Sequence, residues 1–212
     1  MKRAFVQVRK EKLHLLADKA IHWPARSTVI IADLHLGKAM HFRRAGIPVP
    51  QAVEQLNLQR LHHLIEHTRP QEVLLLGDLF HSAYNSSWSA FVAVRRQHAA
   101  VRFTLVSGNH DVLEAKHYVR AGLEVLPCLD RGPFHFTHEP VIHAGHYNLA
   151  GHIHPGIRLV GMGKQTIQLP CFFFGEHGAV LPAFGAFTGL HRMQRKERDR
   201  VFVMADGRVW RV

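Results

Sequence analysis

Hydrophobic residues along this chain come in short runs that polar clusters interrupt, and their spacing switches between a strand-like and a helix-like period. Short apolar runs predict strands at residues 4–8, 12–16, 19–23, 28–32, 72–76, 101–106, 123–126, 133–138, 148–150, 165–174 and 179–182. Apolar residues at near-helical spacing predict helices at residues 51–67 and 87–99, with a shorter one after Ala115. The order strand, helix, strand, helix, strand in residues 28–106 is typical of parallel crossover units in an α/β fold.

The last third of the chain is less regular. The pattern there predicts a strand pair at 133–138 and 140–144, a loop or short helix at 184–190, a solvated charged loop at 191–200, and a hairpin of strands 201–204 and 209–212. The hairpin turn is expected at Asp206-Gly207, a pair that favours tight turns. No internal repeat or linker divides the chain, so residues 1–212 are expected to form a single domain.

Polar side chains that can bind metals follow three of the buried strands. In chain order they are Asp33 and His35, then Asp78, then Asn109, His110 and Asp111. Because ligand sites in open α/β sheets form beyond the carboxyl ends of the strands, we expect these side chains to lie along one rim. Carboxylate, amide and imidazole donors without a thiolate suit Mn, Fe(II), Zn, Co or Ni.

The stretch His152-Ile153-His154 between Gly151 and Pro155 offers two more imidazoles. Pro155 disfavours helical geometry at His154, so we expect an extended stretch with both imidazoles on one face. Gly151 allows a turn or a close backbone approach. A surface His-x-His in a histidine-rich chain is the alternative, and the polar clusters upstream favour the metal site.

His138 is a further candidate ligand because it follows an apolar strand and precedes a turn at Glu139-Pro140. It can instead be a surface histidine at a strand end. The histidines that compete with it for the same role are His135, His143 and His146.

The number of candidate ligands indicates two metal ions. One carboxylate can bridge two ions about 3.5–4 Å apart, and Asp78, on the central strand, is the natural bridge. Two divalent ions carry four positive charges, of which Asp33 and Asp78 remove two and a bridging hydroxide one, leaving a surplus of about one that attracts a phosphate. Asn109 is neutral and keeps that surplus, whereas an aspartate would remove it.

Together these motifs resemble the calcineurin-like metallophosphoesterase superfamily, in the order Asp33-x-His35, Gly77-Asp78, Gly108-Asn109-His110-Asp111, His138 and Gly151-His152-x-His154. The resemblance covers roughly residues 28–180. It implies a β-sandwich of two mixed sheets flanked by helices. It also implies two ligand sets: Asp33, His35, Asp78 and His154 for one metal, and Asp78, Asn109, His138 and His152 for the other.

The resemblance further implies phosphodiester hydrolysis by a hydroxide held between two metal ions. His110 would be the general acid or a stabiliser of the transition state, and Asp111 would orient it. The alternative for His110 is a loop histidine that only packs beside the metals.

A narrower resemblance is carried by Asp33-Leu-His-Leu-Gly-Lys38, by Phe42-Arg43-Arg44-Ala-Gly46-Ile-Pro48, and by Gly77-Asp-Leu-Phe-His81-Ser82. These stretches are similar to the bacterial ligase-associated DNA-damage-response phosphoesterases of the PdeM type. The similarity implies a manganese-dependent phosphodiesterase or endonuclease that acts on DNA in repair. It also implies association with a DNA ligase and a helicase-like protein. Mn is therefore the expected ion, with Fe, Zn, Co and Ni as alternatives.

The formal net charge of +11 favours a polyanionic substrate such as DNA. The candidates for substrate contact are Lys38, Arg43, Arg44 and His81. With Phe42 and Trp88 nearby, a groove that stacks the bases of a single strand is one interpretation. An ordinary basic surface is the other, and His81 can equally have no function.

The chain has two cysteines, Cys128 and Cys171, and they form no CxxC pair. A reduced, cytoplasmic protein without membrane association is therefore expected. The charged start has no apolar signal segment, and no apolar run approaches the roughly 20 residues that span a bilayer.

Two other functions fit parts of the pattern. A small-molecule phosphoesterase acting on a nucleotide, a cyclic nucleotide or a monoester would make the positive charge incidental. A non-catalytic scaffold would be expected to lose ligands, whereas the Asn-His-Asp and His-x-His elements are complete here.

Overall fold

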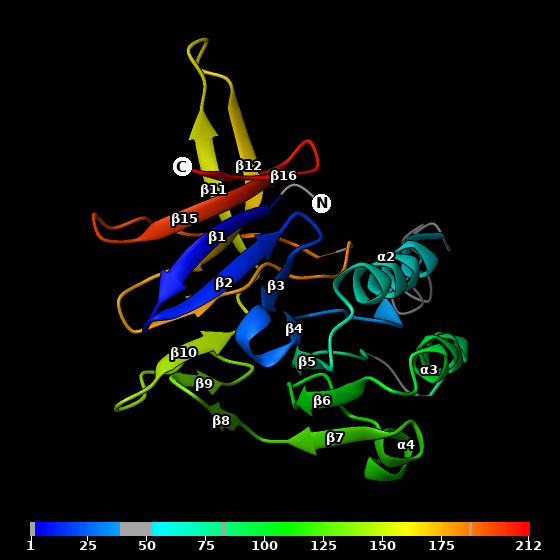
Figure 1. The fold of residues 1–212 in the computed structure, drawn as a ribbon. Helices are drawn as coiled ribbons and strands as arrows, with labels where there is room; N and C mark the ends of the chain where they lie inside the picture. The colour runs from blue at the N-terminus through cyan, green and yellow to red at the C-terminus, as the bar shows by residue number, and fades with distance from the viewer. Residues whose placement is uncertain (1–2, 39–51, 82–83, 187) are drawn as a thin grey trace.

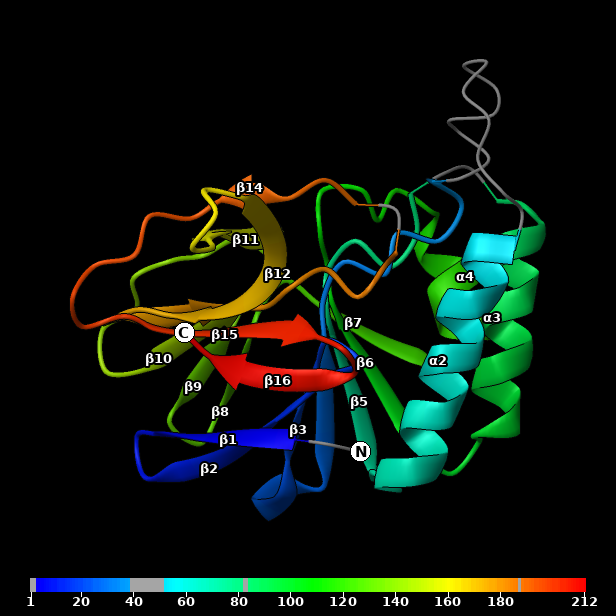
Figure 2. The same ribbon diagram turned by 90° about the horizontal axis from the view of Figure 1, so that it is seen from above.

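Two β-sheets lie face to face, and helices cover the outer side of one of them (Figures 1 and 2). The computed structural model describes residues 3–38, 52–81, 84–186 and 188–212. The arrangement confirms the expected α/β sandwich of two mixed sheets with flanking helices. None of the helices in these residues has the length and apolar character needed to cross a membrane.

The first sheet has seven strands within the described residues, and they lie side by side in chain order. They are β1 (Arg3–Val8), β2 (Glu11–Leu16), β3 (Ala20–Trp23), β4 (Thr28–Ile31), β5 (Glu72–Leu76), β6 (Arg102–Val106) and β7 (Leu123–Leu126). Strands β1 to β4 pair antiparallel and β4 to β7 pair parallel, which confirms the predicted antiparallel start and the crossover units. The connecting helices are η1 (Pro24–Arg26), α2 (Ala52–Thr68), α3 (Ser86–Gln97) and α4 (Ala115–Arg120).

Strand β4 is buried on both faces. Val29 and Ile31 belong to the apolar cluster under the helices, while Ile30 and Ala32 belong to the cluster between the two sheets. This division follows from the alternation of side chains along a strand. Burying one Val or Ile side chain contributes about 1.5–3 kcal/mol. A continuous β-branched run is therefore what a strand covered on both sides requires.

Asn85 caps the N-terminus of helix α3, and its side chain accepts a hydrogen bond from the backbone N–H of Ser87 at 2.8 Å. On its inner face Trp88 is 2% exposed, and its ring centroid lies 5.4 Å from that of Phe80 and 5.3 Å from that of Tyr118. The interpretation of Trp88 as a stacking surface for bases is therefore wrong, because this side chain belongs to the core.

The second sheet has nine strands in the described part of the chain, with the order β14-β11-β12-β13-β10-β9-β8 and with β15 and β16 attached through β12. They are β8 (Leu129–Arg131), β9 (Phe134–Phe136), β10 (Tyr147–Ala150), β11 (Pro155–Val160), β12 (Thr166–Phe174), β13 (Gly178–Val180), β14 (His191–Arg192), β15 (Arg200–Ala205) and β16 (Arg208–Arg211). The antiparallel pairing of β15 with β16 confirms the predicted hairpin.

The predicted pairing of residues 140–144 with the strand at 133–138 is wrong. Strand β9 pairs with β8 on one side and with β10 on the other, and residues 140–146 form no strand. Strands β8, β11 and β14 were not predicted, because they are short or interrupted by Asp, Arg, Pro and Gly, and partner strands determine their conformation. The described part of segment 184–190 forms a loop and no helix.

Candidate metal centre

The carboxyl ends of β4, β5 and β6 meet at one edge of the first sheet, and the predicted polar clusters lie there. Backbone hydrogen bonding between the two segments continues past the ends of β4 and β5. The N–H of Asp33 donates to the carbonyl of Gly77 at 3.2 Å, and the N–H of His35 donates to the carbonyl of Asp78 at 2.8 Å. These bonds hold the first two clusters side by side, as expected at the carboxyl ends of parallel strands.

Left-handed backbone, which non-glycine residues rarely adopt, recurs among the candidate ligands. The residues are Asp33, His35, Asp78, His152 and His154, with φ values from 50° to 66°. Each such conformation costs about 1–3 kcal/mol, and these conformations cluster at functional sites. The expectation of an extended His154 is wrong, because its φ is 51° although a proline follows. A turn in the backbone therefore aims the two imidazoles.

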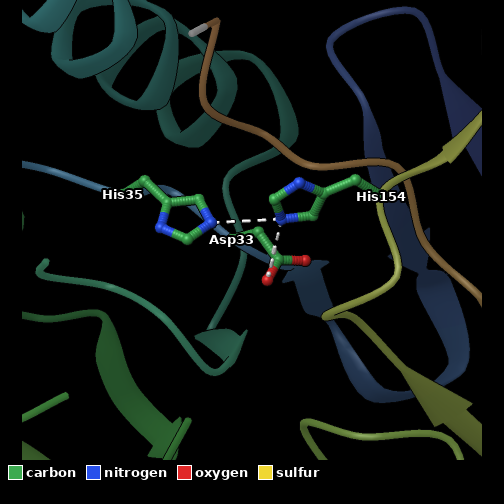
Figure 3. Close-up of side chains that lie close together, drawn as sticks. All are labelled: Asp33, His35 and His154. Atoms are coloured by element: carbon green, nitrogen blue, oxygen red, sulfur yellow. Dashed lines mark hydrogen bonds and ion pairs between the residues drawn. The ribbon is translucent and has the colours of Figure 1, made fainter. Parts of the chain in front are cut away.

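One donor group consists of Asp33, His35 and His154, whose side chains converge from separate segments (Figure 3). The Nε2 atoms of His35 and His154 are 3.1 Å apart, and Nε2 of His154 lies 3.5 Å from Oδ1 of Asp33. The backbone N–H of His152 donates to both carboxylate oxygens of Asp33, at 3.1 and 3.0 Å. The His-x-His turn thereby fixes the orientation of that carboxylate.

A second donor group consists of Asp78, His138 and His152, with one potential ligand atom of each within 4.8 Å of the others. Nε2 of His138 lies 3.1 Å from Nδ1 of His152 and 3.1 Å from Oδ1 of Asn109. Asn109 therefore offers its amide oxygen to this group. The structure thus places the two histidines of the turn in different groups.

Asp78 lies between the two groups. Its Oδ2 is 3.8 Å from Nε2 of His35, and its Oδ1 is 3.4 Å from Nε2 of His138. The N–H of His110 donates to Oδ1 at 2.9 Å. One carboxylate therefore faces both groups, with a different oxygen toward each.

The charge states suit metal ions. Burial, together with the charge of Lys38 and the neighbouring imidazoles, lowers the pKa of His35 to about 2, so its ring is neutral and has a lone pair to offer. Asp33 and Asp78 are 0% and 2% exposed. Buried carboxylates are costly without a compensating charge, and divalent ions bound by these oxygen and nitrogen donors would supply it. The donor set therefore fits two divalent metals.

Three glycines allow the loops to approach one another. A Cβ on Gly151 would lie 2.6 Å from Oδ2 of Asp33, one on Gly108 would lie 2.4 Å from Oδ1 of Asp78, and one on Gly77 would overlap the His138 ring. Such separations are below van der Waals contact. The need for Gly108 was not recognised in the sequence, although its place just after a strand was the available signal.

A calcineurin-like phosphoesterase family model matches residues 27–204. This chain belongs to the calcineurin-like phosphoesterase family. The resemblance identified from the motifs is confirmed. Members of the family use divalent metals and hydrolyse phosphoester bonds, so this protein is a phosphoester hydrolase.

Among solved structures, a nuclease named MPE from Pseudomonas putida is similar over 100% of both chains, with a TM-score of 0.85 and 32% sequence identity. Yfce, a phosphoesterase from E. coli, is more distant, with 13% identity and a TM-score of 0.47 over 87% of this chain and 97% of that chain. No curated protein sequence matches this chain.

In this calcineurin-like phosphoesterase, His138 lies in the candidate metal centre, whereas the three alternative histidines, His135, His143 and His146, do not. Nδ1 of His138 lies 3.0 Å from the carbonyl oxygen of Leu76, which fixes the ring. Asn148, which is 1% exposed, donates from Nδ2 to the carbonyl of His135 at 3.0 Å and to the hydroxyl of Thr137 at 2.8 Å. Asn148 therefore braces the segment that carries His138. This role was not predicted from the sequence, because the only signal was the position of Asn148 among apolar residues.

The candidate catalytic residues lie at the same rim. The ring of His110 packs against that of His81, with centroids 3.8 Å apart, and lies 5.9 Å from that of His35. Asp111 accepts hydrogen bonds from the N–H groups of Gly108 and Phe80, at 2.9 and 3.2 Å. Burial raises the pKa of the Asp111 carboxyl to about 6 despite these bonds. These hydrogen bonds of Asp111 brace two loops, and the orientation of His110 by Asp111 stays a prediction.

Of the candidate substrate contacts, Lys38 and His81 lie beside the centre. Lys38 is half-buried; burial lowers its pKa, while the charges of Asp78 and Asp33 oppose the shift. His81 contacts His110 as described above. Arg43 and Arg44 lie outside the described residues, as does Phe42.

Proposed function

We propose that this protein is a two-metal phosphodiesterase that cleaves DNA. The observation that carries this proposal is the position of Asp78 between two donor groups, with Oδ2 directed to His35 and Oδ1 to His138. A carboxylate that faces two groups of metal-binding side chains is suited to bridging two ions.

Two further observations support DNA as the substrate. The chain is 32% identical, over the full length of both chains, to the nuclease MPE from Pseudomonas putida. It also carries 27 Lys and Arg residues against 16 Asp and Glu residues. A net positive charge raises the local concentration of a polyanion near the protein.

The metals would be held by the two donor groups together with Asn109. When bound, two divalent ions lower the pKa of a water molecule between them and polarise the phosphoryl oxygens. Because Asn109 is neutral, the proposed ligands include two carboxylates, Asp33 and Asp78, and two divalent ions would leave a positive surplus to attract the substrate phosphate.

His110 would donate a proton to the departing sugar oxygen, since a diester leaving group is a poor one without it. Its ring is close to both His35 and His81, so it lies beside the donor groups. Lys38 would contribute positive charge to the substrate phosphate at the same rim.

The central test compares the wild-type protein with Asp78→Asn, an exchange that keeps the side-chain shape and removes the charge. We expect hydrolysis of bis-p-nitrophenyl phosphate with Mn²⁺ to fall about 100-fold or more, because the shared ligand is lost. Asp206→Asn, in an exposed turn, is the matched control and should keep full activity. A folded Asp78→Asn protein that is equally active would contradict the proposal.

The substrate class is tested by a panel of supercoiled plasmid, single-stranded DNA, nucleotides, cyclic nucleotides and monoesters. DNA cleavage that exceeds nucleotide turnover and disappears in Asp78→Asn supports the nuclease. Rapid turnover of nucleotides while DNA stays intact would contradict the nuclease proposal and favour a small-molecule phosphoesterase. The same panel with Mn, Fe, Zn, Co and Ni tests manganese as the working ion.

We further propose a cytoplasmic role in DNA repair, in association with a DNA ligase and a helicase-like protein. This part of the proposal rests on the sequence resemblance alone. Co-purification with an endogenously tagged ligase is its direct test, and absence of this protein and of the helicase-like protein from the purified material would contradict it.

A further inference from the structure

A second imidazole cluster lies on the outer face of β9. The two phenylalanines of β9 pack in the core between the sheets, so His135 between them points to the other side. A residue of the edge strand β8 and two residues of segment 140–146 join it there. We call this set the outer histidine cluster: Asp130, His135, His143 and His146.

The side chains of this cluster are in direct contact. Nδ1 of His135 lies 2.5 Å from Oδ1 of Asp130, and the rings of His135 and His143 stack with centroids 4.2 Å apart. Nδ1 of His143 lies 3.3 Å from Nδ1 of His146. One donor atom each from Asp130, His135 and His143 falls within 4.8 Å of the others.

The pair His143 and His146 has the geometry of the imidazole pairs in the metal centre. Its nitrogens are 3.3 Å apart and its ring centroids 5.0 Å apart. The two pairs in the metal centre have nitrogen separations of 3.1 Å and centroid separations of 5.0 and 4.9 Å. Two imidazole nitrogens at this distance share either a proton or a metal ion.

We propose that the outer histidine cluster binds one divalent ion of the Zn²⁺ class, held by imidazole nitrogens, with Asp130 supplying the negative charge. Imidazole-rich sets with a single carboxylate favour Zn²⁺, Co²⁺, Ni²⁺ and Cu²⁺ over the harder Mn²⁺ and Mg²⁺. The ion ties segment 140–146, which forms no strand, to β8 and β9. The site is separate from the proposed phosphodiesterase centre and does not depend on it.

A third group, His62, Glu66 and His98 between α2 and α3, is less suited to a metal. His98 faces His62 through Nε2 at 2.9 Å and Glu66 through Nδ1 at 3.5 Å. The two partners thus meet opposite sides of one ring. This arrangement is typical of a hydrogen-bonded clasp between helices.

The test measures the number of Zn²⁺ ions per chain by elemental mass spectrometry, after the protein has been loaded with Zn²⁺ and desalted. His143→Ala/His146→Ala is compared with wild type and with His117→Ala/His177→Ala, which also removes two histidines but none of the cluster. We expect the first double variant to retain one ion fewer per chain and the control to match wild type. Equal zinc content in all three proteins would overturn the proposal.

Three further measurements keep the test independent of folding and of the proposed function. Titration with Co²⁺ should give the visible absorption of a tetrahedral imidazole site in wild type, reduced in the double variant and in Asp130→Asn. Circular dichroism without added metal checks that the variants fold. Mn²⁺-dependent hydrolysis of bis-p-nitrophenyl phosphate should be unchanged in His143→Ala/His146→Ala. If the wild-type protein itself does not hydrolyse this substrate, that result contradicts the proposed phosphodiesterase function and not the outer histidine cluster. Identical Co²⁺ spectra in folded wild type and variants would count against the site.

Discussion

At the residue scale, the metal centre depends on which histidine each donor group receives. His154 joins Asp33 and His35, whereas His152 joins Asp78 and His138. These two histidines are only two positions apart, yet they belong to different groups. Both have left-handed backbone, so the chain turns between them and their imidazoles do not share one face as they would in an extended strand. Each histidine should matter mainly for its own metal.

This division predicts selective metal loss. His154→Ala and His152→Ala should each reduce bound Mn²⁺ from about two ions per chain to about one, because the bridging carboxylate remains in both. Metal counting measures the loss. Electron paramagnetic resonance should show the spectrum of an isolated Mn²⁺ ion in place of a coupled pair. Complete loss of both ions in either variant would contradict the assignment.

Glu72 is a second buried charge, and it lies at the opposite end of the first sheet from the centre. It is 1% exposed and is bound by Arg131, by Arg102 at 3.2 Å and by the hydroxyl of Thr104 at 2.8 Å. Burial alone would raise the pKa of the Glu72 carboxyl. The hydrogen bonds from Arg131 and Thr104 and the charges of the two arginines outweigh burial and lower it below its ordinary value. The folded state therefore stabilises the ionised form of the Glu72 carboxyl.

Glu72→Gln should lower the free energy of unfolding by about 2 kcal/mol at pH 7.5, because hydrogen bonds to a charged group are lost. A lowered folded-state pKa stabilises the protein above the ordinary value of 4.5 and ceases to do so as the pH falls through the folded value. The difference in the free energy of unfolding between wild type and variant, measured with urea, should therefore shrink as the pH falls below 4.5. Glu176→Gln, at an exposed position, is the control. A difference that does not vary with pH would refute this account.

At the scale of elements, loops that cross at van der Waals distance form the centre. The turn after β10 presses against the end of β4, so that a Cβ on Gly151 would lie 2.6 Å from Oδ2 of Asp33 and 2.9 Å from the carbonyl oxygen of Leu76. By contrast, a Cβ on Gly189 would meet nothing within 4 Å. Glycine is thus required where two segments of backbone meet.

Gly151→Ala should lower the free energy of unfolding by about 1–3 kcal/mol, because the loops must separate to admit the methyl group. It should also weaken Mn²⁺ binding, since Asp33 is displaced. Gly189→Ala should stay within about 0.5 kcal/mol of wild type. Urea unfolding and isothermal titration with Mn²⁺ measure the two effects. Equal behaviour of the two variants would show that the close approach is unimportant.

At the scale of the whole molecule, charge rather than shape favours a nucleic-acid substrate. The net charge of +11 is spread over a chain in which 27 residues are basic. A DNA strand held partly by this charge releases counterions on binding. A substrate with a single phosphate does not gain in the same way.

DNA affinity should therefore fall steeply with salt. If about four phosphates are contacted, the dissociation constant of Asp78→Asn for DNA should rise about 100-fold between about 50 and 200 mM NaCl. Fluorescence anisotropy measures this change. Over the same range, the KM of wild type for bis-p-nitrophenyl phosphate should change much less. An affinity for DNA that does not depend on salt would exclude an electrostatic contribution.

The sequence by itself determined the strands of the first sheet, the polar clusters at their ends and the family. These features depend on local periodicity and on motifs, which a one-dimensional pattern retains. The runs at β4, β5 and β6 needed no knowledge of their partners, because burial on both faces leaves a continuous apolar signature.

Only the tertiary structure decided how distant segments meet. It placed His138 in the centre and His135 on the outer face, and it paired β9 with β8 and β10. It also buried Trp88 in the core. Strand pairing and close packing set these outcomes, and they overrode the local preference of Pro155 for an extended His154.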